Sequence, residues 1–93
     1  MLTVIGKITA RSEAIGKVRS QLTNLVEPSQ KEAGCIHYSL YQDNDSSAVL
    51  FVYEKWKSKN DLDDHMQMAH FKQCFGEIEG LYDVEVHLLT EVS

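Results

Sequence analysis

The stretch YEKWKSKNDLDDHMQMAHF, residues 53–71, decides the fold because a strand, a turn and a helix follow one another in it without interruption. Ser58 precedes Asp61 by three residues; such a serine accepts a hydrogen bond from a free amide of the first turn, and the acid favours the positive end of the helix dipole. A helix is therefore expected from about Lys59. The helical spacing i, i+3, i+4, i+7 is carried by Leu62, His65, Met66 and Ala69. This spacing predicts that His65 projects toward an apolar core.

A second histidine, His70, follows His65 by five residues. Five residues correspond to roughly 140° around a helix of 3.6 residues per turn, so the two rings should not share one face of a straight helix. The apolar spacing also restarts, from a new origin, at Phe71. We therefore expect a kink or a break between two short helices near residues 67–70.

The composition excludes some classes of partner. The chain has 93 residues, a formal charge of −5 and no cluster of lysine or arginine, which argues against nucleic acid or an anionic membrane as the main partner. It has no recognisable signal peptide and no apolar run long enough to cross a bilayer, so a cytoplasmic protein is expected. The two cysteines, Cys35 and Cys74, fit no zinc or redox motif and are expected to be free thiols.

Alternating apolar residues predict four strands, and helical spacing predicts two helical regions between them. The strands are expected at residues 2–10, 35–41, 48–56 and 82–92, with the first helix starting at Ser12. Pro28 should kink or end that helix, and Gly34 should close its tail in a left-handed conformation. The order is βαββαβ, a split βαβ arrangement that predicts an α+β protein with helices on one face of a four-stranded antiparallel sheet.

This arrangement leaves one face of the sheet without helices. The strand at residues 48–56 is apolar on both faces, since Leu50 and Val52 alternate with Phe51 and Tyr53. An apolar face left in water is unfavourable, and packing of two sheets against each other covers it economically. The residues therefore predict a homodimer.

Several of these residues form a longer pattern, E-x-W-x5-L-x2-H-x4-H-F from Glu54 to Phe71, preceded by E-x-G-C at residues 32–35 and by Tyr38. With this pattern the whole chain resembles the antibiotic biosynthesis monooxygenase family, in particular its small quinol monooxygenase-like members. The resemblance implies a single domain over residues 1–93, with ferredoxin-like subunits that pair into a dimeric α+β barrel. It also implies oxidation of a quinol or related electron-rich aromatic by molecular oxygen, without a flavin or metal cofactor.

The resemblance makes His65 the candidate catalytic base, which removes a proton from a substrate hydroxyl. The alternative is a core histidine hydrogen-bonded to a strand carbonyl, and both interpretations stay open. Trp56 and Phe71 are either flat walls for an aromatic substrate or ordinary core residues. Tyr38 is expected to donate a hydrogen bond to a substrate oxygen.

Two further residues have two interpretations each. Glu54 is a carboxylate on an otherwise apolar face and needs a partner, either a histidine that it orients or Lys7 on a neighbouring strand. His70 is either a second acid or base at the site or a local cap at the helix break. A metal site formed by His65, His70 and Glu54 is disfavoured, because H-x4-H lacks the i, i+4 spacing that places two imidazoles on one ion.

The same scaffold allows two other functions. One is an isomerase of a small hydroxy-ketone, in which His65 and Glu54 would move a proton between adjacent carbons. The other is a stress-related dimer that binds a small molecule without catalysis. Dependence on oxygen separates the monooxygenase from the isomerase, and ligand-induced stabilisation tests for binding.

Overall fold

A computed structural model describes all residues of the chain, 1–93, and gives four strands and three α-helices. The elements are β1 (Leu2–Ala10), α1 (Ile15–Gln30), β2 (Cys35–Gln42), β3 (Val49–Trp56), α2 (Lys59–Gln67), α3 (Ala69–Glu77) and β4 (Tyr82–Leu89). A short 3-10 turn, Ser12–Ala14, leads into α1. The predicted βαββαβ order is confirmed, with the second helical region divided into α2 and α3.

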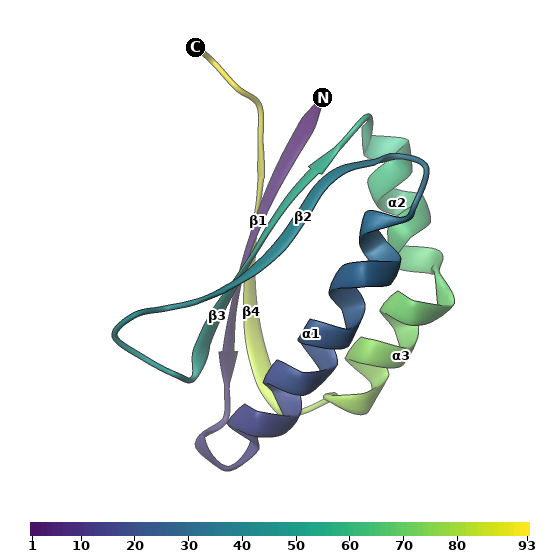
Figure 1. Ribbon diagram of the computed structural model, residues 1–93. Helices are drawn as coiled ribbons and strands as arrows, with labels where there is room; N and C mark the ends of the chain where they lie inside the picture. Colours follow the sequence, from purple (N-terminus) through teal and green to yellow (C-terminus); the bar gives the residue numbers. More distant parts are fainter.

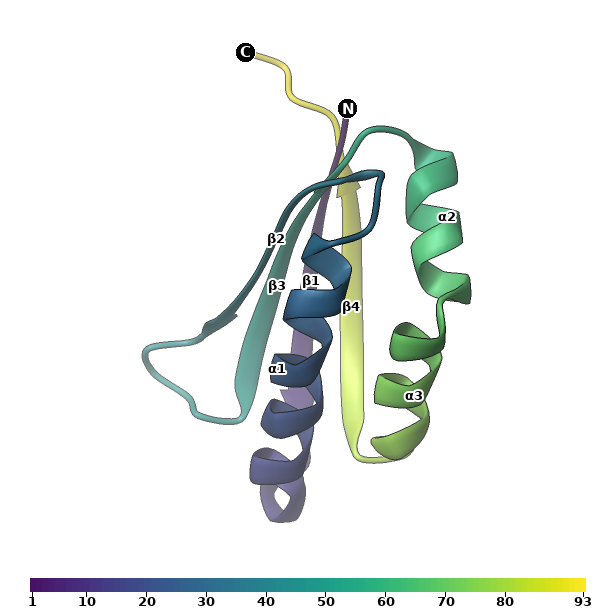
Figure 2. The same cartoon turned by 45° about the vertical axis from the view of Figure 1, so that its right-hand side comes forward.

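The four strands form one antiparallel sheet in the order β2-β3-β1-β4. All three helices lie on the same side of it, with α1 beside the α2–α3 pair (Figures 1 and 2). This is the predicted ferredoxin-like α+β arrangement. It places the end of α1 and the start of β2 next to α2, and the candidate site forms there.

The core lies between the sheet and the helices. Strands β1 and β3 contribute alternate residues to it, which is the period-two pattern that the sequence shows, whereas β2 adds Tyr38 and β4 adds no buried residue. Its buried members are Val4, Ile8, Ala10, Ala14, Val18, Leu22, Leu25, Tyr38, Leu50, Val52, Trp56, Leu62, Cys74 and Ile78. Both cysteines are free thiols, as expected.

No element of the chain covers the opposite face of the sheet (Figure 2). Val49, Phe51 and Tyr53 of β3 lie on it and are only half-buried, whereas the neighbouring Leu50 and Val52 on the helix side are buried. The uncovered apolar face that motivates the homodimer prediction is therefore present in the single chain. The dimer itself stays a prediction.

The last strand differs from the prediction at its end and in its burial. It ends at Leu89 and not at Val92. Its register with β1 places Val84 opposite Ile8 and Leu88 opposite Val4, so these two side chains point to the helix side. Both remain about half exposed, because β4 is an edge strand that the helices do not cover.

Two predictions about α1 and the turn after it are wrong. Pro28 does not end the helix, which continues for two more residues to Gln30. Proline at this position removes only one late hydrogen bond, and the buried Ser29 keeps the last turn against the core. Gly34 has no left-handed conformation, and the one glycine with positive φ is Gly80. A Cβ at Gly34 would overlap the side chain of Asp61, so close approach of α2 explains this glycine.

No helix combines the length and the hydropathy needed to span a bilayer.

Candidate active site

The start of α2 fixes the direction of the helix that carries His65. The side chain of Ser58 accepts a hydrogen bond from the amide of Asp61, which confirms the predicted cap. The helix buries only two side chains, Leu62 and His65, and both face the sheet. His65 is 1% exposed, in agreement with the expectation that it points inward.

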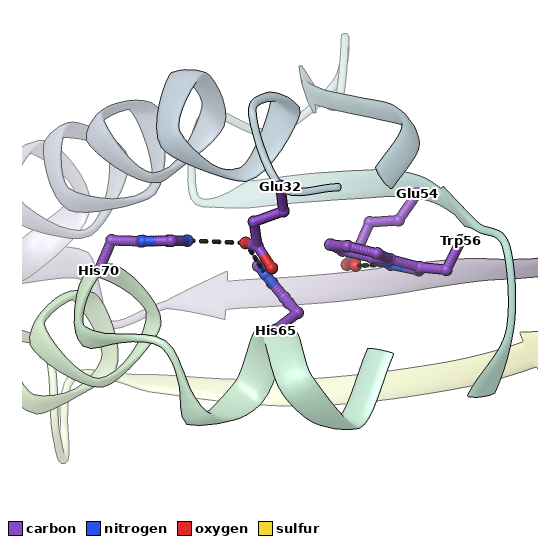
Figure 3. A network of polar contacts seen from close by, with 5 residues as sticks. All are labelled: Glu32, Glu54, Trp56, His65 and His70. Carbon is purple, nitrogen blue, oxygen red and sulfur yellow. Dashed lines mark hydrogen bonds and ion pairs between the residues drawn. The ribbon is translucent and has the colours of Figure 1, made fainter. Parts of the chain in front are cut away.

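A break after α2 places the second histidine. Met68 has an extended backbone (φ −68°, ψ 147°), and α3 begins at the next residue. The predicted break is therefore present, and it changes the relation between the two rings. In a straight helix His65 and His70 would point in different directions, whereas here both turn toward one carboxylate (Figure 3).

That carboxylate belongs to Glu32, in the turn between α1 and β2. Its Oε2 atom lies 2.6 Å from Nδ1 of His65 and 2.7 Å from Nε2 of His70. The Glu32 side chain is only 7% exposed. The turn is held by hydrogen bonds from the Cys35 amide to the Glu32 carbonyl and from the Lys57 amide to the Gly34 carbonyl. The carboxylate thus has a fixed place between the helices.

These contacts assign the protons of both histidines. A carboxylate oxygen accepts hydrogen bonds, so the ring nitrogen that faces it must carry the hydrogen. His65 is therefore protonated on Nδ1, and its Nε2 keeps a free lone pair when the ring is neutral. His70 is protonated on Nε2. Glu32 consequently selects the tautomer of His65 that can act as a base.

Three aromatic rings enclose His65. Its ring centroid lies 4.6 Å from that of Trp56, 5.1 Å from Phe71 and 5.6 Å from Tyr38. Burial among these rings lowers the pKa of His65 below its usual 6.5, and the Glu32 carboxylate opposes the shift. The ring is therefore neutral at neutral pH and retains its lone pair.

Glu54 has a partner that the sequence did not indicate. Its Oε1 accepts a hydrogen bond of 2.8 Å from Nε1 of Trp56, and it pairs neither with Lys7 nor with a histidine. The prediction of such a pair is wrong because the indole, two residues along the same strand face, is nearer. Burial raises the pKa of Glu54 to about 7, although the Trp56 hydrogen bond acts against this. Trp56 thus lies between Glu54 and the His65 ring (Figure 3).

Two hollows lie beside this cluster. An open groove of about 520 Å³ runs between α1 and β2, with Tyr38 in its wall. A smaller hollow of about 160 Å³ lies against α1 and α3 and includes His70. Neither lining includes His65, and Tyr38 separates the groove from its ring. Burial raises the pKa of Tyr38, so its hydroxyl stays protonated and can donate.

The structure therefore brings together most of the predicted site residues. His65, Trp56, Phe71 and Tyr38 form one cluster, His70 joins it through Glu32, and Glu54 touches it through Trp56. Glu32 is the residue that sequence reasoning missed. It belongs to the quoted E-x-G-C segment, but nothing in its spacing connects it with two histidines that lie 33 and 38 residues later.

The other two histidines lie outside this cluster. His37 is half-buried beside Ser39, and its ring lies 4.9 Å from Tyr53. His87 is exposed and pairs with Glu85 on β4.

Comparison with known proteins identifies the family. The model of the antibiotic biosynthesis monooxygenase family matches residues 1–77. An uncharacterised Synechocystis protein, sll1783, is 29% identical over 72 residues, 77% of this chain and 49% of its own length, so the match spans about half of that relative. The crystal structure of PA3566 from Pseudomonas aeruginosa has a TM-score of 0.95 and 32% identity, covering 99% of this chain and 94% of the other.

A more distant structure shares the fold. SnoaB from Streptomyces nogalater, described as a cofactor-independent oxygenase, has a TM-score of 0.84 at 14% identity and covers 99% of this chain and 93% of its own. At that identity the likeness concerns the fold alone. The family match covers most of the chain and agrees with the fold and with the quoted pattern. The chain therefore belongs to the antibiotic biosynthesis monooxygenase family.

Proposed function

We propose that this protein is a monooxygenase that oxidises a quinol or a related electron-rich hydroxyaromatic with molecular oxygen, using His65 as its base. The observation that carries the proposal is the Glu32–His65 pair within an aromatic enclosure. The pair leaves Nε2 of a neutral ring free to take a proton. SnoaB, which shares the fold, is described as a cofactor-independent oxygenase, and this supports the oxygenase part of the proposal.

In the proposed reaction Nε2 of His65 takes the proton of a substrate hydroxyl. The resulting phenolate is a much better electron donor to oxygen than the neutral phenol is. One oxygen atom of O₂ enters the ring, which is oxidised to a quinone, and the other leaves as water with two hydrogens from the substrate. His65 returns its proton to the departing oxygen, so the enzyme is unchanged after one turnover.

Glu32 acts as a positioning residue in this proposal. Its hydrogen bond of 2.6 Å holds the imidazole in the basic tautomer, and its negative charge stabilises the imidazolium that forms. The buried carboxylate of a serine protease triad acts on its histidine in the same way. His70 has a related part, since it donates to the same oxygen and helps to hold Glu32 in place.

The substrate is proposed to bind in the groove between α1 and β2. A volume of about 520 Å³ accommodates an aromatic ring with substituents, and the Tyr38 hydroxyl can donate to a substrate oxygen. A base must come within about 2.6–3.2 Å of the proton that it removes. Tyr38 must therefore swing away from His65 when substrate binds, and Trp56 and Phe71 would then form the walls of the site.

The proposal includes a homodimer. The sheet face with Val49, Phe51 and Tyr53 is uncovered and carries these apolar side chains of β3 beside polar partners such as Lys7 and Thr9 of β1, and a second copy of the same sheet covers it symmetrically. The helices, and with them the His65 site, stay on the outside of such a dimer.

Oxygen uptake with a panel of hydroquinones tests the proposal, using chelator-treated, flavin-free protein and a blank without enzyme. We expect uptake above the blank for wild type and loss of this uptake in His65→Ala and His65→Gln, with folding checked by circular dichroism. Arg11→Gln, at the far end of the sheet beside Gly80, is the matched control and should retain activity. Equal uptake by wild type and His65→Gln would remove His65 from the mechanism.

One observation favours a second candidate, the isomerase. Glu54 has a pKa of about 7 and is therefore partly protonated at neutral pH, as a carboxyl that moves a proton between two carbons must be. Turnover of a small hydroxy-ketone under anaerobic conditions, lost in Glu54→Gln, would support this function and would contradict the monooxygenase.

A further inference from the structure

Three side chains of metal-binding type converge at the break between α2 and α3. Nδ1 of His65, Nε2 of His70 and a carboxylate oxygen of Glu32 all lie within 4.8 Å of one another. Each comes from a different segment, namely α2, α3 and the turn after α1 (Figure 3). The two imidazoles approach the same carboxylate oxygen, so three potential ligand atoms already lie close together.

We propose that Glu32, His65 and His70 form a binding site for a single divalent transition-metal ion of the zinc type. Two imidazoles and one carboxylate suit zinc, cobalt or nickel, whereas calcium and magnesium prefer oxygen ligands throughout. The site supplies three protein ligands and leaves the fourth tetrahedral position to water.

Binding of an ion requires the three side chains to rearrange. Metal–ligand bonds of about 2.0–2.2 Å in a tetrahedron place neighbouring ligand atoms roughly 3.3 Å apart. In the structure Oε2 of Glu32 lies 2.6 and 2.7 Å from the two nitrogens. The two nitrogens lie within 4.8 Å of each other, so a withdrawal of the carboxylate by about 0.7 Å must be joined by an approach of the two imidazoles to open the space that the ion needs.

Charge supplies an independent argument for a cation. The Glu32 side chain is 7% exposed, and its ion-pair partners are the two histidines alone, with no lysine or arginine. The carboxylate thus has no permanently charged cationic side chain beside it, and a buried charge without a counter-charge is unfavourable. A divalent ion in this position balances it. The ion reaches the site past His70, whose side chain is 26% exposed and lines the hollow between α1 and α3.

Metal binding changes the tautomer of His65. The ion takes the lone pair of Nδ1, so the single proton of the neutral ring moves to Nε2, and no proton is released overall. His65 then lacks the free Nε2 that the proposed base requires. This consequence rests on the proposed function: the metal-bound and catalytic states exclude each other, and zinc inhibits the oxygenase.

Titration of chelator-treated protein with Co²⁺ tests the site, with the visible absorption of the ion and calorimetry as readouts. We expect one ion per chain at neutral pH and an intense band of tetrahedral type. Glu32→Gln and His70→Gln should each weaken binding by more than about tenfold, because even changes to outer-sphere partners weaken metal sites about 10- to 100-fold. Glu32→Gln keeps the shape and both hydrogen bonds, so folding is preserved.

The exposed His87 and Glu85 are the matched control, since they form a histidine–carboxylate pair of 2.9 Å away from the site. His87→Gln should bind Co²⁺ as wild type does. No stoichiometric binding, or binding that His87→Gln weakens and His70→Gln does not, would overturn the metal site.

The metal titration and the oxygen assay fail independently. Co²⁺ binding that depends on His70, in a protein without oxygen uptake on any hydroquinone, supports the metal site and contradicts the oxygenase. Oxygen uptake that depends on His65, without any Co²⁺ binding, supports the oxygenase and contradicts the metal site. When the protein shows both Co²⁺ binding and oxygen uptake, Zn²⁺ should abolish the uptake. The Zn²⁺ concentration at half-inhibition should equal the directly measured dissociation constant of Zn²⁺. Uptake that persists at saturating Zn²⁺ would show that the ion does not occupy Nδ1 of His65.

Discussion

Replacement of Glu32 by glutamine should separate the charge of this residue from its shape. Both histidines donate to the same oxygen, so the amide oxygen of glutamine can accept both hydrogen bonds in the same place. What is lost is the negative charge 2.6 Å from Nδ1 of His65. The variant therefore tests whether the carboxylate stabilises an imidazolium or only fills space.

The size of the effect follows from the strength of a charged hydrogen bond. Hydrogen bonds to charged groups contribute about 1.5–3 kcal/mol, and each 1.36 kcal/mol corresponds to a tenfold change in rate. If the bond reaches its full strength when His65 takes up the substrate proton, kcat of Glu32→Gln falls by about 10- to 150-fold. The expected loss lies well outside the error of an oxygen electrode.

The pH profile of the same variant has a distinctive direction. Burial lowers the pKa of His65 below 6.5, and Glu32 raises it part of the way back. Removal of the charge should lower this pKa further, so the acid limb of the rate profile moves to lower pH while the plateau falls. A variant that had merely lost its fold would lose activity without that shift of the acid limb.

Nitrogen NMR of the histidine rings completes the assay. Wild-type His65 should show its hydrogen on Nδ1 at neutral pH, and Glu32→Gln should retain this tautomer if the amide oxygen faces the ring. If the amide rotates and its NH₂ group faces His65, the proton moves to Nε2 and activity is lost altogether. A rate within twofold of wild type, with the hydrogen still on Nδ1, would refute the proposed role of Glu32.

Three further predictions concern stability and assembly. The pKa of Glu54 is raised from 4.5 to about 7. The contribution of this residue to folding stability should therefore be full below pH 4.5 and decline by about 3 kcal/mol as pH rises through 7. In urea unfolding Glu54→Gln should lack this decline, whereas the variant Glu79→Gln, at an exposed position, should retain it. Gly34→Ala should lose about 1–3 kcal/mol of unfolding free energy through overlap with Asp61. An added Asp61→Ala should recover part of this loss, and no recovery would show that the overlap is not its cause. Light scattering should show a dimer at micromolar concentration and a monomer for Phe51→Glu; a monomeric wild type would contradict the argument from the uncovered sheet face.

The regular elements could be predicted because each one repeats its apolar residues with the period of its own secondary structure. The strand at Leu2–Ala10 and the start of α2 at Lys59 fall where alternation and the Ser58 cap place them. The failures occur where tertiary contact decides. Gly34 is required because the side chain of Asp61 comes close to it. Pro28 lies in the last turn of α1, which packing against the core holds in place. Neither cause is visible in the local sequence.

The candidate site could be predicted in its aromatic part and not in its polar part. The inward direction of His65 follows from helical spacing, and its neighbours Trp56 and Phe71 lie nearby in the chain. Glu32 is distant in sequence, and only the packing of α1 against α2 brings its carboxylate to the ring. The partner of Glu54, by contrast, lies only two residues away on the same strand. The sequence suggests Trp56 as an aromatic wall of the site and does not show that its indole N–H donates to Glu54.

The break at Met68 is the feature on which the chemistry of the site depends. A continuous helix would separate the two histidines by roughly 140°, and in that geometry they could not face a common partner. The extended backbone at Met68 removes this premise, since it turns His70 back toward the oxygen that already holds His65. One carboxylate then governs where the proton of His65 lies. In the proposed oxygenase the hydrogen on Nδ1 leaves the ring a base, and in the proposed metal site an ion on Nδ1 makes it a ligand, so both proposals depend on the same three side chains.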